Sequence, residues 1–176
     1  MDLLKVFRDV NDFPIEGIVF KDITPVLRDP KAFKYSVDSI TAYCRSKNIT
    51  DIVAPDARGF LWGAPVAYKL GLPLHIVRKA GKLPPPVNKF SYTLEYGEAE
   101  LELNTDSVFN NKSQVCIIDD VSATGGTANA IVQLLRSAGC IKIDYACVLD
   151  LTFLQGTAKL KDYCDVNCFS VAQLNA

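Results

Sequence analysis

The chain has 176 residues, of which 49% are apolar and 22% are charged, and its formal net charge is −1. These values are typical of one globular domain that lacks a basic field for nucleic acid or an anionic membrane. No apolar run approaches the roughly 20 residues that a membrane span needs, and Met1–Lys5 lacks the apolar core of a signal peptide, so we expect a cytoplasmic protein.

The N-terminal part of the chain combines a helical pattern with a segment rich in turn-forming residues. Apolar residues recur at helical spacing over Asp2–Val10, which predicts a helix there. The segment Phe13–Leu27 contains two prolines and a glycine and is expected to be irregular. Asp29 is a candidate N-cap and Pro30 suits the first helical position, so an amphipathic helix is expected to begin there.

Beyond this helix, short apolar runs alternate with helical patterns, which predicts an α/β fold with a parallel sheet and helices on both faces. Two further segments, joined near Gly97, alternate as in a hairpin. Ligands of such sheets bind beyond the carboxyl ends of the strands. The expected strands are Asp51–Ala54, Leu74–Val77, Tyr92–Tyr96, Ala99–Leu103, Val115–Ile118 and Tyr145–Leu149, and the further expected helices are Phe60–Leu70 and 127–138.

A Gly-rich turn follows the buried strand at Val115–Ile118 and leads into a helix. Gly125 and Gly126 permit positive φ, and the helix start aims backbone N–H groups and a positive dipole at one point. The lysine of a Walker loop and the glycine triplet of a dinucleotide site are both missing from this turn. The turn therefore predicts a phosphate site formed by Ala123, Thr124, Gly125, Gly126 and Thr127.

Two acids, Asp119 and Asp120, stand between the strand and the turn. Carboxylates repel a phosphate, so we expect both to accept hydrogen bonds from the vicinal hydroxyls of a sugar. Together with the turn they would bind a sugar 5-phosphate. The alternative is an ordinary strand-to-helix turn with two solvated aspartates.

This motif resembles the phosphoribosyl-pyrophosphate (PRPP) motif of type I phosphoribosyltransferases, and other segments narrow the resemblance to the adenine phosphoribosyltransferase family. Phe13–Leu27 resembles the adenine-binding segment, Asp56–Phe60 the pyrophosphate loop, and Arg78–Gly97 the mobile catalytic loop. The resemblance extends from about Phe13 to Leu160. It implies a parallel-sheet type I phosphoribosyltransferase fold in one domain, 1–176, with an N-terminal hood at roughly 1–27 and a mobile hairpin loop at roughly 79–103.

The reaction implied by the resemblance is purine salvage, in which adenine and PRPP give AMP and pyrophosphate. Mg²⁺ is expected to arrive on the diphosphate and to keep several waters, without a dedicated protein cage. The resemblance also implies a homodimer, and the bulky apolar residues Phe60, Leu61 and Trp62 beside the pyrophosphate loop suit a subunit contact.

The resemblance assigns pyrophosphate binding to two basic segments. Arg58 can hold phosphate with two parallel hydrogen bonds, and its alternative role is that of a surface arginine. The second basic segment is the cluster of Arg78, Lys79 and Lys82, whose alternative role is that of a solvated patch. The Asp56–Ala57 peptide is expected to be strained or cis when ligand is bound. The assigned residues are Asp56, Ala57, Arg58, Arg78, Lys79 and Lys82.

Adenine is implied to stack on Phe20, with Leu151 covering its other face and the backbone at Val19 and Lys21 reading its amino edge. A backbone carbonyl at that edge accepts from an amine and repels a keto oxygen. Phe20 and Leu151 would otherwise be plain core residues. Lys21 stands where the family commonly has arginine, and this change should be silent if the contact is made by the main chain.

Glu95 is implied to accept the proton from N7 of adenine, as the general base of the reaction. It lies on one arm of the predicted hairpin, with its side chain opposite to those of its two neighbours. The alternative is a solvated strand glutamate, which is what we expect of Glu98, Glu100 and Glu102.

Two other functions compete with this interpretation. A hypoxanthine or guanine transferase would place a lysine or an aromatic residue late in the chain to read a keto group, and Leu151–Leu154 offers no such lysine. A PRPP-sensing regulator that binds nucleic acid would need a basic face or an added DNA-binding segment, and neither is visible in the sequence.

Six cysteines and one histidine, His75, are present, without a Cys-x-x-Cys pair. Structural zinc is therefore disfavoured, and the thiols are expected to pack as small apolar side chains in a reducing compartment. Cys164 and Cys168 are expected on either side of a late strand. His75 is expected to lie in a strand with a local hydrogen-bond partner.

Overall fold

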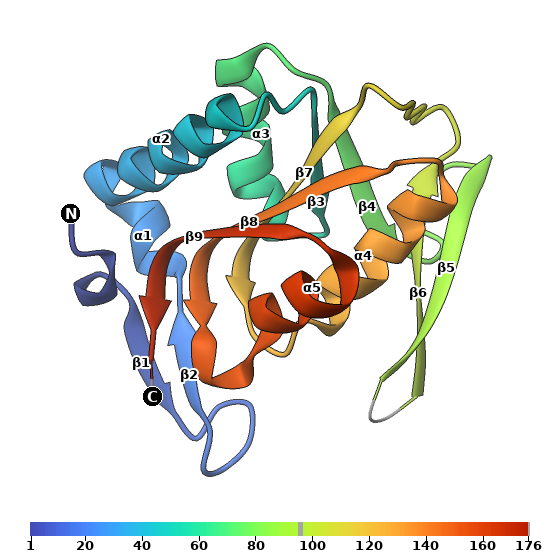
Figure 1. Cartoon of the computed structure of the whole chain (residues 1–176). Coiled ribbons are helices and arrows are strands. Elements are labelled where there is room, and N and C mark those ends of the chain that lie inside the picture. The colour runs from blue at the N-terminus through green and yellow to red at the C-terminus, as the bar shows by residue number, and fades with distance from the viewer. Residues whose placement is uncertain (95–96, 176) are drawn as a thin grey trace.

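A seven-stranded mixed sheet forms the centre of the computed structural model, which describes residues 1–94 and 97–175 (Figure 1). Strands β4, β3, β7, β8 and β9 run parallel, whereas β6 is antiparallel to both of its neighbours. The order across the sheet is β5 (Val87–Leu94), β6 (Gly97–Asn104), β4 (Leu74–Lys79), β3 (Asp51–Pro55), β7 (Gln114–Ser122), β8 (Lys142–Leu151) and β9 (Asn167–Leu174).

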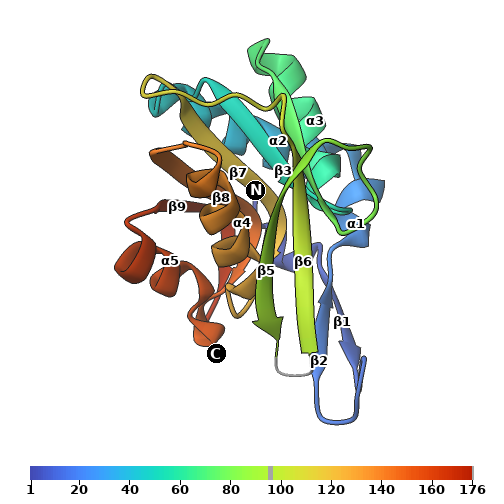
Figure 2. The same ribbon diagram turned by 90° about the vertical axis from the view of Figure 1, so that its right-hand side faces the viewer.

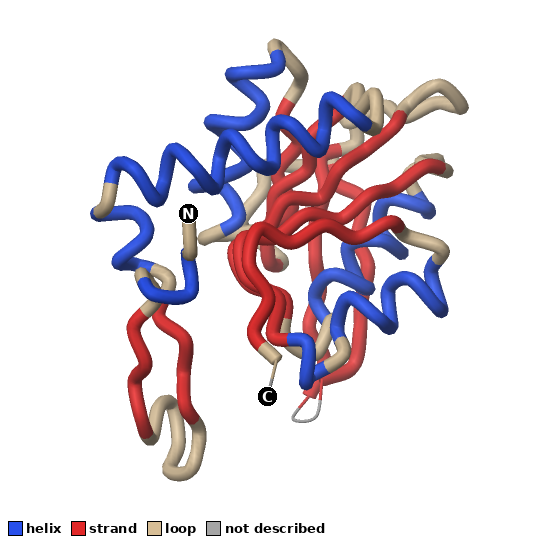
Figure 3. The backbone as a smooth tube through the Cα atoms, turned by 60° about the vertical axis from the view of Figure 1, so that its left-hand side comes forward, coloured by secondary structure: helices blue, strands red, loops and turns tan. Residues whose placement is uncertain are grey.

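Helices cover both faces of this sheet (Figure 3). The central strand β7 shows why, because its apolar residues alternate between two cores. Ile118 packs with α2 (Pro30–Ser46) and α3 (Gly59–Leu70), whereas Ile117 packs with α4 (Gly126–Ser137). A strand that is buried on both sides needs the continuous apolar run seen in the sequence, so the predicted α/β fold is confirmed.

Local signals set the ends of the helices as predicted. The carboxylate of Asp29 accepts hydrogen bonds from the N–H groups of Lys31 and Ala32, and Pro30 occupies the first helical position of α2. Gly71 ends α3 in a left-handed conformation with φ +65°. These two helices cover one face of the sheet. The core on this face includes Trp62 of α3, which is fully buried.

The prediction for the N-terminal segment was wrong. In place of a helix over Asp2–Val10, a 3-10 turn at Leu3–Lys5 is followed by strand β1 (Arg8–Asn11). The segment expected to be irregular contains strand β2 (Val19–Asp22) and helix α1 (Thr24–Arg28), and β1 and β2 form a separate antiparallel hairpin. The ladder between β1 and β2 depends on a partner in the chain, which helical spacing alone does not reveal.

The C-terminal segment adds helix α5 (Gly156–Cys164), which was not predicted, and strand β9, which begins later in the chain than the expected late strand. Cys164 and Cys168 do not flank a strand, because Cys164 ends α5 and Cys168 lies within β9. β9 pairs with β8 and completes the edge of the sheet.

The two hairpins frame one end of the molecule. β1–β2 and β5–β6 both extend in the direction in which the parallel strands end, on opposite sides of those ends (Figures 1 and 2). The loops that follow β3 and β7 lie between them, where the site was predicted. In the described ranges, 1–94 and 97–175, no helix has the length and apolar character needed to cross a membrane.

Candidate active site

The loops after β3 and β7 meet at one cavity of about 350 Å³. The two strands pair in parallel, with Ile52 opposite Cys116, so their carboxyl ends point to the same edge. This pairing brings together segments that are more than 60 residues apart in the sequence. The cavity is lined by Pro55, Asp56, Ala57, Arg58, Asp119, Asp120, Val121, Ser122, Ala123, Thr124, Gly125, Gly126, Thr127, Ala128 and Tyr145.

The predicted phosphate turn has the geometry of an anion cradle. Helix α4 begins at Gly126, so the first N–H groups of the helix face the cavity side of the turn without helical partners. Gly125 precedes the helix with φ +84°, a conformation that residues with a side chain rarely adopt. All five residues predicted for this site line the cavity.

The reverse side of the turn rests on Gly156, a residue that no feature of the sequence singled out. A Cβ added to Gly125 would lie 2.9 Å from the carbonyl oxygen of Gly156, and a Cβ added to Gly156 would lie 2.3 Å from that of Ala123. Two backbones are therefore in direct contact, and the N-terminus of α5 supports the turn. No local signal in the sequence around Gly156 could have identified this contact, because its partner lies about 30 residues away in the chain.

The two predicted ribose-binding acids lie in different environments. Asp120 is buried, and its Oδ2 lies 2.5 Å from Nε of Arg58, which itself reaches solvent. Burial and repulsion from the neighbouring Asp120 raise the pKa of Asp119 well above its usual range. Asp119 Oδ1 also accepts a hydrogen bond of 2.8 Å from the Asp120 N–H. Burial, together with the close spacing of the acids, thus favours a proton on Asp119.

Two of the predicted pyrophosphate residues, Arg78 and Lys82, lie against a third, Asp56. Its Oδ2 lies 3.2 Å from Nε of Arg78 and 3.4 Å from Nζ of Lys82. Although burial raises the pKa of Asp56, the hydrogen bonds from these two cations lower it overall. The peptide bond between Asp56 and Ala57 is cis. Arg78, Lys79 and Lys82 are not among the residues that line the cavity, and Lys79 ends β4 with an exposed side chain.

The predicted adenine residues occupy the hood hairpin and the end of β8. Phe20 packs edge to face against Phe13, with ring centroids 5.2 Å apart, and Val19 is exposed beside it. Nζ of Lys21 lies 2.5 Å from the carboxylate of Asp9 on the facing strand. The Lys21 side chain therefore stabilises the hairpin. Only the backbone of Lys21 is then left to contact a base.

Leu151 is half-buried at the end of β8. The structure does not place Leu151, Val19, Phe20 or Lys21 among the residues that line the cavity. Glu95, the predicted general base, lies outside the described residues.

Glu102 contradicts the expectation of a solvated strand residue, because it is only 3% exposed. Glu100 is half-buried, so it is less exposed than the solvated residue that we expected. The period-two pattern of the strand correctly places both acids on one face, but it does not reveal that this face is covered by a turn of the chain.

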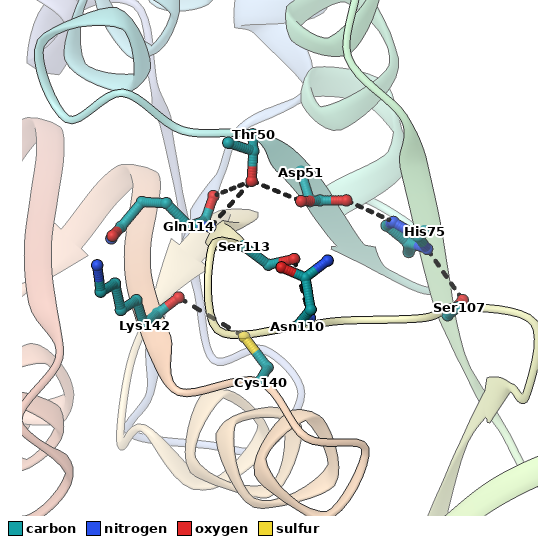
Figure 4. Close-up of polar contacts among 9 residues, drawn as sticks. All are labelled: Thr50, Asp51, His75, Ser107, Asn110, Ser113, Gln114, Cys140 and Lys142. Carbon is teal, nitrogen blue, oxygen red and sulfur yellow. Dashed lines mark hydrogen bonds and ion pairs between the residues drawn. The ribbon is translucent and has the colours of Figure 1, made fainter.

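The prediction for His75 is confirmed. Its Nδ1 lies 2.9 Å from the hydroxyl of Ser107 and its Nε2 lies 3.2 Å from Asp51, which also accepts from Thr50 (Figure 4). Asp51 and His75 lie at the amino ends of β3 and β4, and Ser107 lies in the segment after β6, so the network is opposite to the cavity. This network is a local structural one.

Neither disulfides nor a metal cluster appear in the part of the chain that the structure describes. All six cysteines are free, and five of them are buried. No group of three or more His, Cys, Asp or Glu side chains within residues 1–94 and 97–175 is placed to hold a metal ion. The expected role of the thiols as apolar packing groups agrees with their burial.

Comparisons with known proteins identify the family. A model of the phosphoribosyl transferase domain matches residues 27–176. The adenine phosphoribosyltransferase of Clostridium acetobutylicum is 48% identical over 163 residues, which cover 93% of this chain and 94% of the relative. This chain belongs to the adenine phosphoribosyltransferase family.

Solved structures of this family have the same fold. The crystal structure of adenine phosphoribosyltransferase from Thermoanaerobacter pseudethanolicus has a TM-score of 0.89 and 43% identity, with 98% of each chain covered. The enzyme from Trypanosoma brucei, in complex with AMP, pyrophosphate and ribose-5-phosphate, has a TM-score of 0.85 and 31% identity. That comparison covers 96% of this chain and 76% of the other.

The contact between the two glycine backbones leads to a prediction for Gly125. Gly125→Ala is expected to lower the affinity for ribose 5-phosphate by about tenfold or more, because the new Cβ displaces the anion cradle. Gly71→Ala is the matched control, since Gly71 has a similar φ of +65° with nothing within 4 Å of an added Cβ. Titration calorimetry measures both, and equal affinities of the two variants would contradict the prediction.

The raised pKa of Asp119 predicts a pH-dependent stability. Between its ordinary value of 3.8 and the raised folded value, the folded state binds more protons than the unfolded state. Stability contributed by Asp119 therefore falls as pH rises through this window. Asp119→Asn, which cannot ionise, is expected to gain stability over wild type between about pH 5 and about pH 8. Urea unfolding without ligand measures this, and a constant difference between the two proteins would oppose it.

Proposed function

We propose that this protein is a pentosyltransferase that joins adenine to PRPP, releasing pyrophosphate and forming AMP for purine salvage. The observation that carries the proposal is the shared cavity of the glycine turn and its two acids, in a chain of the adenine phosphoribosyltransferase family. AMP, pyrophosphate and ribose-5-phosphate, the ligands of the Trypanosoma brucei complex, support this proposal.

In this proposal the turn at 123–127 binds the 5-phosphate and the acids bind the ribose hydroxyls. The backbone N–H groups are fixed before the ligand arrives, so little reorganisation accompanies binding. Asp120 is held by Arg58, whereas Asp119 is free to exchange its proton for the hydrogen bonds of a diol. The ribose is thereby anchored at both ends, with C1 directed toward the loop after β3.

The pyrophosphate is proposed to bind at 56–58 together with Arg78, Lys79 and Lys82. Arg78 and Lys82 already lie against Asp56, and a diphosphate carries more negative charge than this one carboxylate. The substrate therefore competes with Asp56 for both cations. Loss of pyrophosphate leaves positive charge at C1, as in glycoside chemistry, so stabilisation of the leaving group lowers the barrier.

Mg²⁺ fits these residues as a companion of the diphosphate. No three-ligand cluster is found within the described residues, but Asp119 and Asp120 offer carboxylates beside the ribose position. Mg²⁺ on the diphosphate would neutralise charge on the leaving group while keeping several waters. The protein would touch these waters through the two acids.

Adenine is proposed to lie between Phe20 and Leu151, with the backbone of Val19 and Lys21 at its amino edge. The hood, roughly 1–27, would cover the base, and the hairpin at roughly 79–103 would close over the site as the mobile loop. Glu95 would then accept the N7 proton as N9 attacks C1. The engagement of the Lys21 side chain with Asp9 supports a contact through the main chain.

A homodimer in the cytoplasm completes the proposal. Leu61 on α3 is exposed and Phe60 is half-buried, which suits a subunit contact. Trp62 does not contribute to such a surface, because it lies in the core and donates a hydrogen bond to Ser36. Sedimentation as a species of twice the chain mass supports the dimer, and a fully active monomer excludes it.

The free thiols fit a reducing compartment, which cell fractionation can test.

An assay with a panel of bases tests the function. PRPP-dependent nucleotide formation in the presence of Mg²⁺ is expected with adenine and to be at least about 100-fold slower with hypoxanthine or guanine, whose keto group meets a backbone carbonyl. Preference for a keto base would favour the alternative transferase. Binding of PRPP without nucleotide formation from any base would favour a sensing role.

The role of Glu95 leads to a separate prediction. Glu95→Gln is expected to slow the single-turnover rate by about 10²–10⁴-fold, the range typical of a lost general base, with little change in PRPP affinity. Glu100→Gln on the same hairpin is the control and should keep the wild-type rate. Single-turnover measurement avoids the masking of chemistry by product release. Equal rates for Glu95→Gln and wild type would remove Glu95 from the mechanism.

A further inference from the structure

Glu102 is a buried acid that the proposed mechanism does not use. It lies on β6 directly opposite two cations, Arg78 on β4 and Lys89 on β5. Residues opposite one another in antiparallel strands point to the same face. The three side chains therefore form a row across the sheet, with the carboxylate at its centre and only 3% exposed.

The carboxylate of Glu102 holds the backbone of the turn at 80–83, which follows β4 and is called the basic turn. Its Oε2 accepts a hydrogen bond of 3.0 Å from the N–H of Gly81, and its Oε1 lies 3.2 Å from Nζ of Lys89. The Gly81 N–H is the main cause that lowers the pKa of Glu102, with further contributions from the Lys89 ammonium and then from the Leu83 N–H. An ionised carboxylate thus stabilises a turn in which Gly81 has φ +76°.

The same turn carries Lys82, one of the cations assigned to pyrophosphate, and contacts Arg78 at the end of β4. Nη1 of Arg78 donates a hydrogen bond of 3.0 Å to the carbonyl of Lys82, so the position of one cation depends on the backbone of the other. The side chains of both cations pair with Asp56. When a diphosphate displaces Asp56, these side-chain pairs are lost, whereas the bond from Gly81 to Glu102 remains.

We propose that Glu102 is a positioning residue that sets the basic turn at 80–83 for pyrophosphate recognition. The inference rests on the proposed function and deepens it. Glu102 touches no substrate; it fixes the backbone of the turn, which carries Lys82 and holds Arg78 through the Lys82 carbonyl. Glu102 therefore influences ligands that carry a pyrophosphate and leaves binding of the 5-phosphate unchanged.

The test compares two ligands that differ in the pyrophosphate group alone. Glu102→Met keeps the length of the side chain but leaves the Gly81 N–H without an acceptor. This variant is expected to raise the KM and the Kd of PRPP by about tenfold, with the Kd of ribose 5-phosphate changed by less than about twofold. Calorimetry and steady-state kinetics of the full chain with Mg²⁺ give these values.

Two further variants complete the experiment. Glu102→Gln retains one acceptor oxygen and is isosteric, so it is expected to fold and to raise the PRPP KM by about threefold. It carries the test if Glu102→Met does not fold. Glu100→Met is the matched control: Glu100 pairs with the same lysine at 2.8 Å, and its side chain holds no backbone group of the turn. Its affinities should equal those of wild type.

The outcomes are distinct. A loss of affinity confined to PRPP supports the inference. Equal losses for PRPP and ribose 5-phosphate would show general structural support and overturn it, as would unchanged PRPP affinity in both Glu102 variants. If the wild-type protein itself does not bind PRPP, the proposed function fails and the inference fails with it. If the wild type does bind and transfer, the function stands whatever the variants do.

Discussion

The parallel pairing of β3 with β7 is the constraint on which the site depends. Each strand ends in a loop that carries only part of the chemistry: an acid and an arginine after β3, and two acids with a glycine turn after β7. Parallel strands end at the same edge, so one register of backbone hydrogen bonds fixes the distance between the two loops. Both strands are buried on two faces, which makes this register costly to change.

Charge balance is the second organising feature of the site. Arg58 lies against Asp120, and Arg78 and Lys82 lie against Asp56. Each of these three cations assigned to the anionic substrate thus already has a carboxylate partner. Such pairs hold flexible side chains close to their working positions and limit repulsion among the cations. The arrangement suits a site that must accept and then release a highly charged group, because each acid can pair with its cation again after the group has left.

Backbone contacts determine the shape of both anion sites. The phosphate turn rests on Gly156, and a Cβ at either glycine would lie within 3.0 Å of the opposite backbone. The basic turn rests on the carboxylate of Glu102 through the Gly81 N–H. In both cases the supporting residue comes from a different element and lies behind the residues that would meet the ligand. Rigid support of this kind is what allows electrostatic groups to act without reorganisation.

The sequence alone determined the elements whose signals are local. The apolar run before Asp119 predicted β7, the glycine pair predicted the start of α4, and Asp29 with Pro30 predicted the start of α2. These predictions succeeded because backbone conformation at a cap or a glycine turn is set by a few neighbouring residues. The order of motifs along the chain was also enough to indicate the family, since the motifs keep their spacing.

Only the tertiary structure decided which residues support the site. The hairpin β1–β2 replaced an expected helix because Val10 pairs with Phe20, a partner that the helical spacing could not reveal. The burial of Glu102 and Trp62 and the contact of Gly125 with Gly156 likewise join distant parts of the chain. A pattern in the sequence records which side chains are apolar or charged. Which of them come to lie together depends on how the strands and helices pack.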